Sequence, residues 1–345
     1  MTTPKTVQVS DDAGATWHTL PGNAGAFNQE AGGIDDTIFG ASFGSEEIGL
    51  INWTIDSQAF YKGFAGYHAK IKQQGASTPM LGEAMTLVSG QRYKITNAAK
   101  NIWNRMATFV VYDNAVDHTA DVLSFNYLFG EVVFKPAYIV VGPVTVDGSF
   151  YPTTTLGKAN AFTLGQSADT IETSDFATVQ ANGGFRTFIQ GLKKASLDLT
   201  SFYDVTAGFR AALIARDELI VELDPAGTGE SVARGFFKIG SEKQSGNVGA
   251  LEEETTALPL NVPELVEIPF GWQHFSTTLS QAVQIVLGAW ETGGIIDVRY
   301  LYDGTNGVRG TAIITDMSLA GGIDNMNEFT VKFQGTAATT DVGTG

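Results

Sequence analysis

One stretch of the chain occurs twice, and this duplication constrains the fold more than any other feature. The segment 234–239, RGFFKI, returns as 309–314, RGTAII, at an offset of 309 − 234 = 75 in the numbering. At the same offset Ile220–Leu223 falls on Ile295–Val298. The copies agree in chemical type at alternating positions, as two copies of one β-unit would. A duplicated structural module indicates an assembly more often than an active site.

A second echo has an offset of 202 − 60 = 142, where Phe60-Tyr61 returns as Phe202-Tyr203. The first offset also places Glu253 on Glu328. Glu253 is the middle residue of Glu252–Glu254, a run of three carboxylates that could be taken for a pair of catalytic carboxylates. Adjacent residues of a strand face opposite sides, however, so this pattern favours a solvated or lumen-facing acidic stripe.

Length and composition predict a mainly β protein. The 345 residues suffice for two domains with cores of their own, and 40 glycines with 22 phenylalanines suit short strands joined by tight turns. We expect two tandem β-sandwich or partial-barrel domains, 1–168 and 169–345, each with a flanking short α-helix. The last residues, 336–345, are predicted to form a flexible tail.

Charge and cysteine content exclude several classes of function. With 21 basic and 37 acidic residues the formal charge is −16, and such a surface repels phosphate backbones. The chain has no cysteine, so it forms no disulfide and no cysteine-ligated metal site. Its four histidines are scattered, and the N-terminus lacks the apolar core of a signal peptide. We therefore expect no cofactor, no metal and no membrane insertion.

Local patterns predict a hairpin over 6–20, a loop over 21–45, an amphipathic strand over 50–60, a short helix over 64–71 and a polar stretch over 165–184. Two further helices are predicted, at 207–214 and 279–290. The remaining strands are predicted at 85–88, 92–95, 108–112, 123–125, 132–134, 138–146, 161–164, 195–201, 219–223, 234–239, 255–260, 270–275, 295–302, 310–318 and 328–333.

Residues 10–17, SDDAGATW, fit the Asp-box pattern S-x-D-x-G-x-T-W of sialidase propellers. The box is physically a β-turn, in which aspartate caps backbone amides and glycine takes a positive φ. A propeller would carry several boxes and a cluster of arginines, which this chain lacks, so a structural turn is the preferred interpretation. A carbohydrate-binding or sialidase-like protein remains the alternative. No nucleophile, base and orienting group occur together, so no catalytic residue is predicted.

Two runs of residues resemble structural proteins of tailed bacteriophages. They are 92–103, RYKITNAAKNIW, and 126–134, NYLFGEVVF. Segments 181–199 and 234–254 resemble the continuation of the same pattern. Together these runs cover most of residues 50–262 and are similar to the major tail tube protein of long, non-contractile tails, while 263–345 resembles the closing strands of a further tube unit.

This resemblance implies a ring-forming β-sandwich whose inner sheets join between subunits, with rings stacked along the virion tail. Two tube units per chain would make a ring of three chains with pseudo-sixfold symmetry. The resemblance further implies assembly in the host bacterial cytoplasm, no enzymatic activity, and contacts with tape-measure, tail terminator and distal tail proteins. Double-stranded DNA would pass during genome ejection without specific binding. Another ring-forming phage protein, such as a terminator or a secretion-system tube protein, stays open.

Candidate residues follow from this interpretation. An acidic lumen would include Glu253 and Glu328. A long loop is expected over 72–83 with an apolar tip, and a second over 224–229. We therefore expect inter-ring contacts from four residues of these loops, together with the N-terminal strand and the C-terminal tail: Gln74, Met80, Leu81 and Pro225.

Overall fold

The computed structural model describes residues 5–35, 46–60, 68–158, 161–202, 209–224, 231–245, 253–261, 269–274, 280–322 and 325–343. The described chain is mainly β, which confirms the predicted fold class. Its strands form three sheets, of twelve, seven and five strands. Its α-helices are short: α1 (Phe176–Ala181), α2 (Phe209–Ala215) and α3 (Gln281–Thr292).

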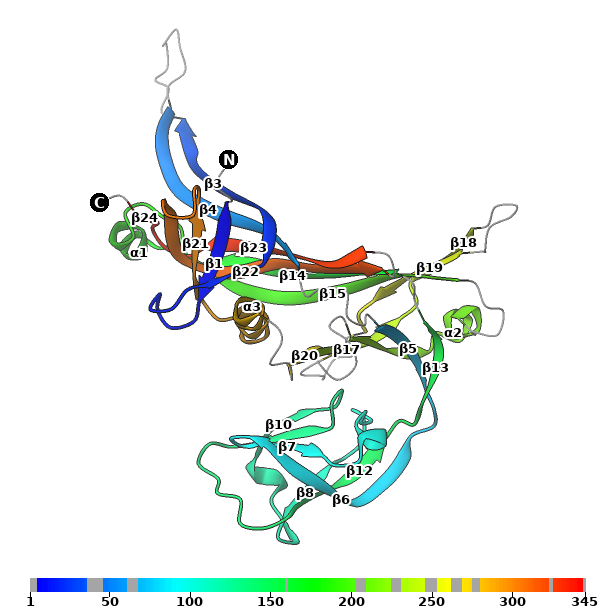
Figure 1. Ribbon diagram of the computed structural model, residues 1–345. Helices are drawn as coiled ribbons and strands as arrows, with labels where there is room; N and C mark the ends of the chain where they lie inside the picture. The colour runs from blue at the N-terminus through cyan, green and yellow to red at the C-terminus, as the bar shows by residue number, and fades with distance from the viewer. Residues whose placement is uncertain are drawn as a thin grey trace.

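Eight antiparallel strands form one long sheet, in the order β18-β19-β15-β14-β22-β23-β4-β3. Their bounds are β3 (Gly22–Asp35), β4 (Glu46–Phe60), β14 (Ala161–Glu172), β15 (Phe188–Phe202), β18 (Ser241–Ser245), β19 (Glu253–Pro259), β22 (Gly307–Gly322) and β23 (Asn325–Gly335). The sheet crosses the upper part of the molecule in Figure 1 and bends upwards at its β3–β4 end, while α3 lies beneath it.

Four shorter strands extend this sheet around the first half of β22. That half of β22 pairs with β21 along one edge and with β24 along the other, and β21 continues through β1 to β2. These strands are β1 (Thr6–Ser10), β2 (His18–Thr19), β21 (Ile296–Leu301) and β24 (Thr340–Val342). Because β22 is longer than its neighbours, it connects the long sheet to this side branch.

A second sheet has the order β13-β5-β16-β17-β20. Its strands are β5 (His68–Gln74), β13 (Thr153–Lys158), β16 (Glu218–Asp224), β17 (Ser231–Lys238) and β20 (Phe270–His274). The main hydrophobic core unites residues of the long sheet, α3 and the second sheet, among them Trp53, Leu164, Val286, Trp290 and Phe237. The body of the protein is therefore a sandwich with a helix at its centre.

Residues 78–150 form a separate lobe with its own core, below the second sheet in Figure 1. Its sheet order is β10-β11-β7-β6-β12-β8-β9. Its elements are β6 (Thr78–Ser89), β7 (Arg92–Ile95), η1 (Ala98–Lys100), β8 (Val110–Asp113), β9 (Val116–Asp117), η2 (Thr119–Asp121), β10 (Val122–Asn126), β11 (Glu131–Phe134) and β12 (Val144–Phe150). The lobe is inserted between β5 and β13, which pair with each other at its base.

The lobe is held to the second sheet by a small apolar cluster and two arginines. Ile102, Leu128 and Phe129 of the lobe pack with Ile220 and Phe236 of the sheet, and all five are buried. The arginines lie beside this cluster, one from each side. Burial of these side chains and the arginine contacts fix the lobe against the outer face of the sheet.

Each arginine of this interface contacts the opposite partner. From the lobe, Arg105 makes an ion pair with Glu218 and lies over the ring of Phe236. From the sheet, Arg234 donates through Nη1 to the carbonyl of Leu128 at 3.0 Å. Such contacts between a guanidinium and a carboxylate, carbonyl or ring add direction to the apolar packing.

The strand registers of the long sheet repeat at the offsets found in the sequence. Phe60 of β4 pairs with Glu328 of β23, and Phe202 of β15 pairs with Glu253 of β19. The first residues of these pairs differ by 202 − 60 = 142 and the second by 328 − 253 = 75. The duplication is thus confirmed at the level of pairing. The long sheet consists of two equivalent half-sheets, β3-β4-β23-β22 and β14-β15-β19-β18, joined where β22 pairs with β14.

The elements beside the half-sheets repeat as well. The first half of β22 lies between β21 and β24, as β17 lies between β16 and β20, and α3 and α2 precede β21 and β16. Val221 pairs with Gly235 and Val298 with Gly310, so β16 and β21 correspond at an offset of 298 − 221 = 77. The alignment of Ile220 with Ile295 from the sequence is therefore wrong by two residues.

The repeated elements are nested along the chain. One set comprises β1 to β4 and then α3 to β24, and the other, from β5 to β20, lies between them. The predicted division into 1–168 and 169–345 places residue 168 within β14, whose two neighbours come from the second segment. The division into two domains, 1–168 and 169–345, stays a prediction, whereas the repeated strand pairings follow the nested sets.

Several local predictions differ from the structure. The segment 21–45, predicted as a loop, contains β3, because pairing with β4 overrides the weak strand preference of its glycines and asparagines. Gly22 lies so near β4 that a Cβ there would be 2.4 Å from the carbonyl oxygen of Gln58. The helix over 64–71 is wrong for residues 68–71, which belong to β5 and pair with β16; Lys70 and Ile71 also pair with β13. Residues 61–67 lie outside the described part.

Two segments predicted to be irregular are ordered. Within 165–184, β14 continues to Glu172, and α1 begins after Asp175, whose Oδ1 accepts a hydrogen bond from the amide of Thr178 at 2.7 Å. The tail that was predicted to be flexible forms β24, and the indole of Trp53 donates to the carbonyl of Ala337 at 2.7 Å. The tail is therefore paired with β22 as far as Val342.

Trp53 is expected to be a main determinant of stability. Its side chain is 1 % exposed, and a Cβ at Gly335 would lie 2.1 Å from its ring. Trp53→Ala should lower the free energy of unfolding by about 3–5 kcal/mol, measured by chemical denaturation. Leu192→Ala, at a side chain 71 % exposed, is the control and should change it by less than about 0.5 kcal/mol. A loss below about 1 kcal/mol for Trp53→Ala would contradict this account of the core.

Candidate functional site

The long sheet buries one face and exposes a polar face. In β23 the side chains of Phe329, Val331 and Phe333 are buried, while Glu328 and Lys332 are exposed. The same alternation holds in the neighbouring central strands. The remaining side chains of this polar face are Thr54, Asp56 and Gln58 in β4, Asp316 and Ser318 in β22, Thr163 and Ser167 in β14, Ser196, Asp198 and Thr200 in β15, and Thr330 in β23.

Carboxylates outnumber amines among these residues. Asp56, Asp198, Asp316 and Glu328 are exposed, and Lys332 pairs across the strands with Asp56 on one side and Asp316 on the other. Opposite charges on neighbouring strands stabilise the sheet modestly. The surplus of carboxylates gives the polar face a negative potential, which offers a phosphate backbone little to bind.

One predicted lumen carboxylate lies on the polar face. Glu328 accepts a hydrogen bond through Oε2 from Nε2 of Gln58 at 3.5 Å. Glu253 takes the equivalent register position in β19, where it pairs with Phe202, and its side chain lies outside the described part. The duplication therefore links the two residues, and their lumen role stays a prediction.

The long sheet ends in two exposed edges. At one end β3 pairs with β4, and at the other β18 pairs with β19; within the described residues neither strand has a second neighbour. The two edges lie at opposite ends of the sheet in Figure 1. An open edge presents unpaired backbone donors and acceptors and is a template for a further strand.

A pair of carboxyls distinguishes the β18 end from the rest of the sheet. Glu254 of β19 is 2 % exposed and shares a hydrogen bond with Glu242 of β18. Burial, the charge of Glu242 and this hydrogen bond raise the pKa of Glu254 to about 7. In the first half-sheet the equivalent positions hold Met317 and Phe329, both buried. The second half-sheet thus has two carboxyls near its edge where the first has two buried apolar side chains.

The Glu254 carboxyl should make stability pH-dependent. Its pKa is higher in the folded protein than its ordinary 4.5, so the folded state is favoured at low pH and loses stability as the pH rises through about 7. Glu254→Gln should remove this loss and raise stability on the order of 2 kcal/mol at pH 8, with a smaller gain at pH 5. Melting temperatures at both pH values test this.

The matched control for this test is Glu328→Gln, which removes an exposed carboxylate from the polar face. It should change the melting temperature little at either pH, because exposed charges contribute little to stability. An equal difference between Glu254→Gln and the unaltered protein at pH 5 and pH 8 would contradict a raised pKa.

The predicted inter-ring residues do not form one exposed loop. Residues 72–83 lie mostly in β5 and β6, and Gln74 donates through Nε2 to Glu218 Oε1 at 2.6 Å. Met80 is 2 % exposed in the core of the lobe, whereas Leu81 is 77 % exposed. The expectation of an apolar Met80-Leu81 tip is therefore wrong for Met80. Pro225 lies outside the described residues, and an inter-ring role for Leu81 stays a prediction.

The Asp-box forms the turn expected of it. Asp12 accepts hydrogen bonds from the hydroxyl of Ser10 at 2.6 Å and the amide of Thr16 at 2.8 Å, which lower its pKa to about 2. Gly14 has φ of 78°, and the Trp17 ring lies under the guanidinium of Arg299. The turn joins β1 to β2. In the other repeated set, the lobe takes the equivalent position between β5 and β13. A structural role accounts for the residues that define the pattern: Ser10, Asp12, Gly14, Thr16 and Trp17.

A surface hollow of about 410 Å³ lies between this turn and α3. Its lining includes Asp11, Gln281, Gln284 and Thr292 but, in the part of the chain that is described, no arginine. A sialidase-like site needs cationic side chains to bind the carboxylate of its sugar. The hollow therefore gives the carbohydrate-binding alternative no support.

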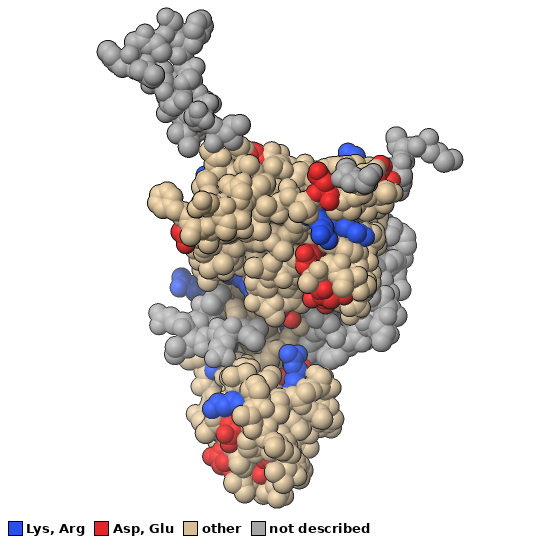
Figure 2. Space-filling model, turned by 90° about the vertical axis from the view of Figure 1, so that its left-hand side faces the viewer, with Lys and Arg blue, Asp and Glu red and all other residues tan. Residues whose placement is uncertain are grey.

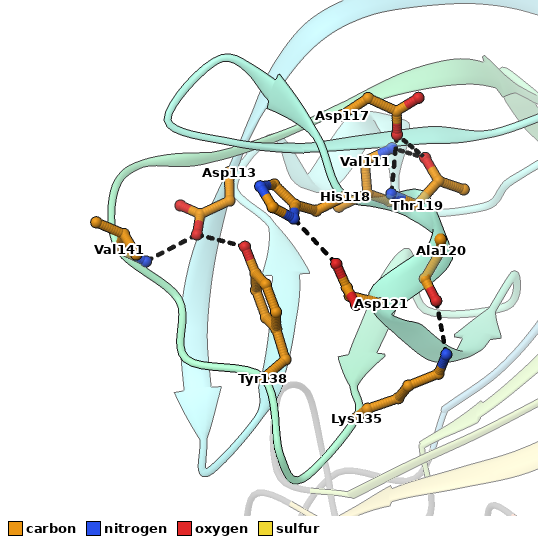
Figure 3. A network of polar contacts seen from close by, with 10 residues as sticks. All are labelled: Val111, Asp113, Asp117, His118, Thr119, Ala120, Asp121, Lys135, Tyr138 and Val141. Atoms are coloured by element: carbon orange, nitrogen blue, oxygen red, sulfur yellow. Dashed lines mark hydrogen bonds and ion pairs between the residues drawn. The ribbon is translucent and has the colours of Figure 1, made fainter.

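A network of polar contacts fastens a loop of the lobe (Figure 3). The Asp113 carboxylate accepts hydrogen bonds from the amides of Val141 and Gly142, both at 2.7 Å, and from the hydroxyl of Tyr138 at 2.8 Å. Burial alone would raise the pKa of Asp113, but these donors lower it. The neighbouring His118 binds Asp121 at 3.0 Å. With every oxygen of Asp113 engaged by the loop, the network is structural.

Other classes of site are not seen in the described residues. Among the described residues, no group of three or more His, Asp or Glu side chains is placed to hold a metal ion. No described helix has the length and apolar character needed to cross a membrane. In the view from the left-hand side of Figure 1, charged side chains of both signs are spread over the body and the lobe (Figure 2).

Sequence reasoning missed one buried ionic cluster. The Glu222 carboxylate binds Arg234 Nη2 at 2.7 Å and Lys72 Nζ at 2.8 Å, so β5, β16 and β17 are joined through their side chains. Burial opposes ionisation, but the two cations lower the pKa of Glu222 to about 2. Lys72 is far from the other two residues in sequence, and only the pairing of β5 with β16 brings it there.

Comparison with known proteins gives limited similarity. No protein-family profile matches the sequence, and no curated protein matches it significantly. Solved structures with detectable similarity include the tail of an empty gene transfer agent particle, at 15 % identity over 32 % of this chain and 84 % of that chain, with a TM-score of 0.28. They also include the virion of a native gene transfer agent particle, at 16 % identity over 32 % and 85 %, again with a TM-score of 0.28. Similarity at this level supports no inference about function.

Proposed function

We propose that this chain is the structural subunit of a bacteriophage tail tube, which assembles into stacked rings of three chains and carries out no enzymatic reaction. The sequence resemblance of residues 92–103 and 126–134 to major tail tube proteins suggests this class. The observation that carries the proposal is the duplicated half-sheet. Each chain has two equivalent units of four strands in one continuous sheet, with an open edge at either end.

A closed ring accounts for this architecture. An open sheet edge is a hazard in a lone molecule, and closure of the sheet into a barrel removes it. Three copies with eight strands each would form a barrel of 24 strands with six equivalent units. The duplication within each chain would then supply the pseudo-sixfold symmetry of the ring.

In this arrangement the polar face would line the lumen. The opposite face of the sheet is buried against α3 and the second sheet, so only the polar face is available to contents of a channel. Asp56 and Asp198 occupy equivalent positions, at the offset of 198 − 56 = 142, and would recur around the whole circumference. A lumen lined by carboxylates lets DNA slide because it forms no strong contacts with phosphates.

The remaining assignments of the proposal follow from the tube role. The protein would reside in the virion tail after assembly in the host bacterial cytoplasm. Its partners would be further copies of itself, with tape-measure, terminator and distal tail proteins at the ends and inside of the tube. Double-stranded DNA would pass through during genome ejection.

Assembly is the direct test of this proposal. Purified protein should form rings or tubes visible by negative-stain electron microscopy. The mass of one ring should be about 110 kDa, for three chains of 36.7 kDa each. A ring of six chains would contradict the role assigned to the duplication, and a protein that stays monomeric under all conditions would contradict the tube function.

The charge of the polar face gives a separate prediction. In assembled tubes, the double variant Asp56→Lys/Asp198→Lys should retain short double-stranded DNA in a sedimentation assay at low salt and release it as salt is raised. Unaltered tubes and the control Asp56→Asn/Asp198→Asn should retain none, since they lack added cations. Equal DNA retention by all three kinds of tube would show that this face does not meet DNA.

A further inference from the structure

We propose that β18 of one copy pairs antiparallel with β3 of the next copy, with Lys243 opposite Asn28, and that this contact is a repeat of the β22–β14 junction inside each chain. The proposal rests on the tube function for its biological setting. The partner is thus a second copy of this chain, and the proposal specifies which residues of the two strands lie opposite each other.

The template for this contact is present within the molecule. At the β22–β14 junction, the last strand of one half-sheet pairs with the first strand of the other, and Ser318 lies opposite Gly165. In the second half-sheet the strand equivalent to β22 is β18, and in the first the strand equivalent to β14 is β3. A ring built from equivalent units would use the same junction between chains as within them.

The pairings inside each half-sheet show which residues of the open edges are equivalent to the residues of this junction. Gly165 pairs with Ser196, the counterpart of Thr54 at an offset of 142, and Thr54 pairs with Asn28. Asn28 therefore takes the place of Gly165.

The same transfer applies at the other end of the sheet. Ser318 pairs with Thr330, the counterpart of Thr255 at an offset of 75, and Thr255 pairs with Lys243. Lys243 therefore takes the place of Ser318. The internal pair Gly165–Ser318 becomes the pair Asn28–Lys243 between chains.

The side chains along this register are compatible with pairing. The predicted pairs are Glu30 with Ser241, Gln29 with Glu242, Asn28 with Lys243 and Ala26 with Ser245, so no two like charges lie opposite each other. Lys243 lies diagonally across from Glu30, an arrangement that favours opposite charges. These residues are exposed at the edges, apart from the partly exposed Glu242, and are accessible to a partner.

Engineered disulfides can test the register because the chain has no cysteine of its own. Directly opposite residues of antiparallel strands have Cα atoms about 4.5–5.5 Å apart, within reach of a disulfide. The test variant is Asn28→Cys/Lys243→Cys, oxidised after assembly and analysed by non-reducing electrophoresis. It should give covalently linked chains up to a closed trimer in high yield.

Two matched variants make this experiment decisive. Gly165→Cys/Ser318→Cys places the same pair at the internal junction, and it should form an intrachain disulfide and leave single chains. Glu30→Cys/Lys243→Cys shifts the register by two residues and should cross-link poorly, since diagonal residues are about 7–8 Å apart.

The outcomes separate this proposal from the tube function. Rings in which the internal pair closes but Asn28→Cys/Lys243→Cys does not, or in which the shifted pair closes instead, would overturn the proposed contact and leave the tube function intact. Efficient Asn28–Lys243 cross-linking in open chains without rings or tubes would support the contact and count against the tube. No association under any condition would overturn both.

Discussion

Backbone hydrogen bonding between strand edges is the constraint on which this structure depends. Each strand must pair along both edges or leave donors and acceptors open to water. In the long sheet every inner strand is paired on both sides, and the register of one half-sheet is copied in the other: Phe60 opposite Glu328, Phe202 opposite Glu253. The outer edges of β3 and β18 have no second strand within the described residues, so the proposed contact between copies would use the same kind of backbone hydrogen bond that holds each chain together.

The two faces of the long sheet differ in what their side chains contact. One face buries large side chains such as Trp53, Phe329 and Phe333 against α3 and the second sheet, and this packing fixes the strands in register. The side chains of the other face are not packed into the core, and they include exposed carboxylates such as Asp56 and Asp198. Because side chains alternate along a strand, a shift of one residue would exchange these faces, so the buried core also determines what the polar face presents.

The sequence predicts the parts of this structure that depend on local pattern or on repetition. Alternation at Trp53 and Ile55 predicts β4, the helical spacing of 279–290 predicts α3, and the repeat of Glu253 as Glu328 corresponds to equivalent register positions. Features that depend on distant pairing are not predictable in this way. β3 has a weak pattern of its own and exists through its pairing with β4.

The same limit applies to the candidate site. Met80 lies in an apolar dipeptide that resembles a loop tip, but it is buried because the inserted lobe has a core of its own. Leu81, its neighbour, is exposed as expected. No local sequence pattern indicates the nested order of the two repeated sets, because that order depends on β23, near the end of the chain, pairing with β4, near its beginning. The polar face could therefore be foreseen as an acidic stripe, but its full membership depends on that long-range pairing.

The lobe has a consequence for the exterior of any assembly. It occupies the connection between β5 and β13, while the equivalent connection between β1 and β2 is the short turn around Asp12. It also lies beyond the second sheet, away from the polar face (Figure 1). A ring of six equivalent units would then be sixfold on its inside and threefold on its outside, with knobs on alternate units. Such a cylinder would have three smooth grooves between three ridges, and a fibre or ligand on its surface would meet this alternation instead of a uniform wall.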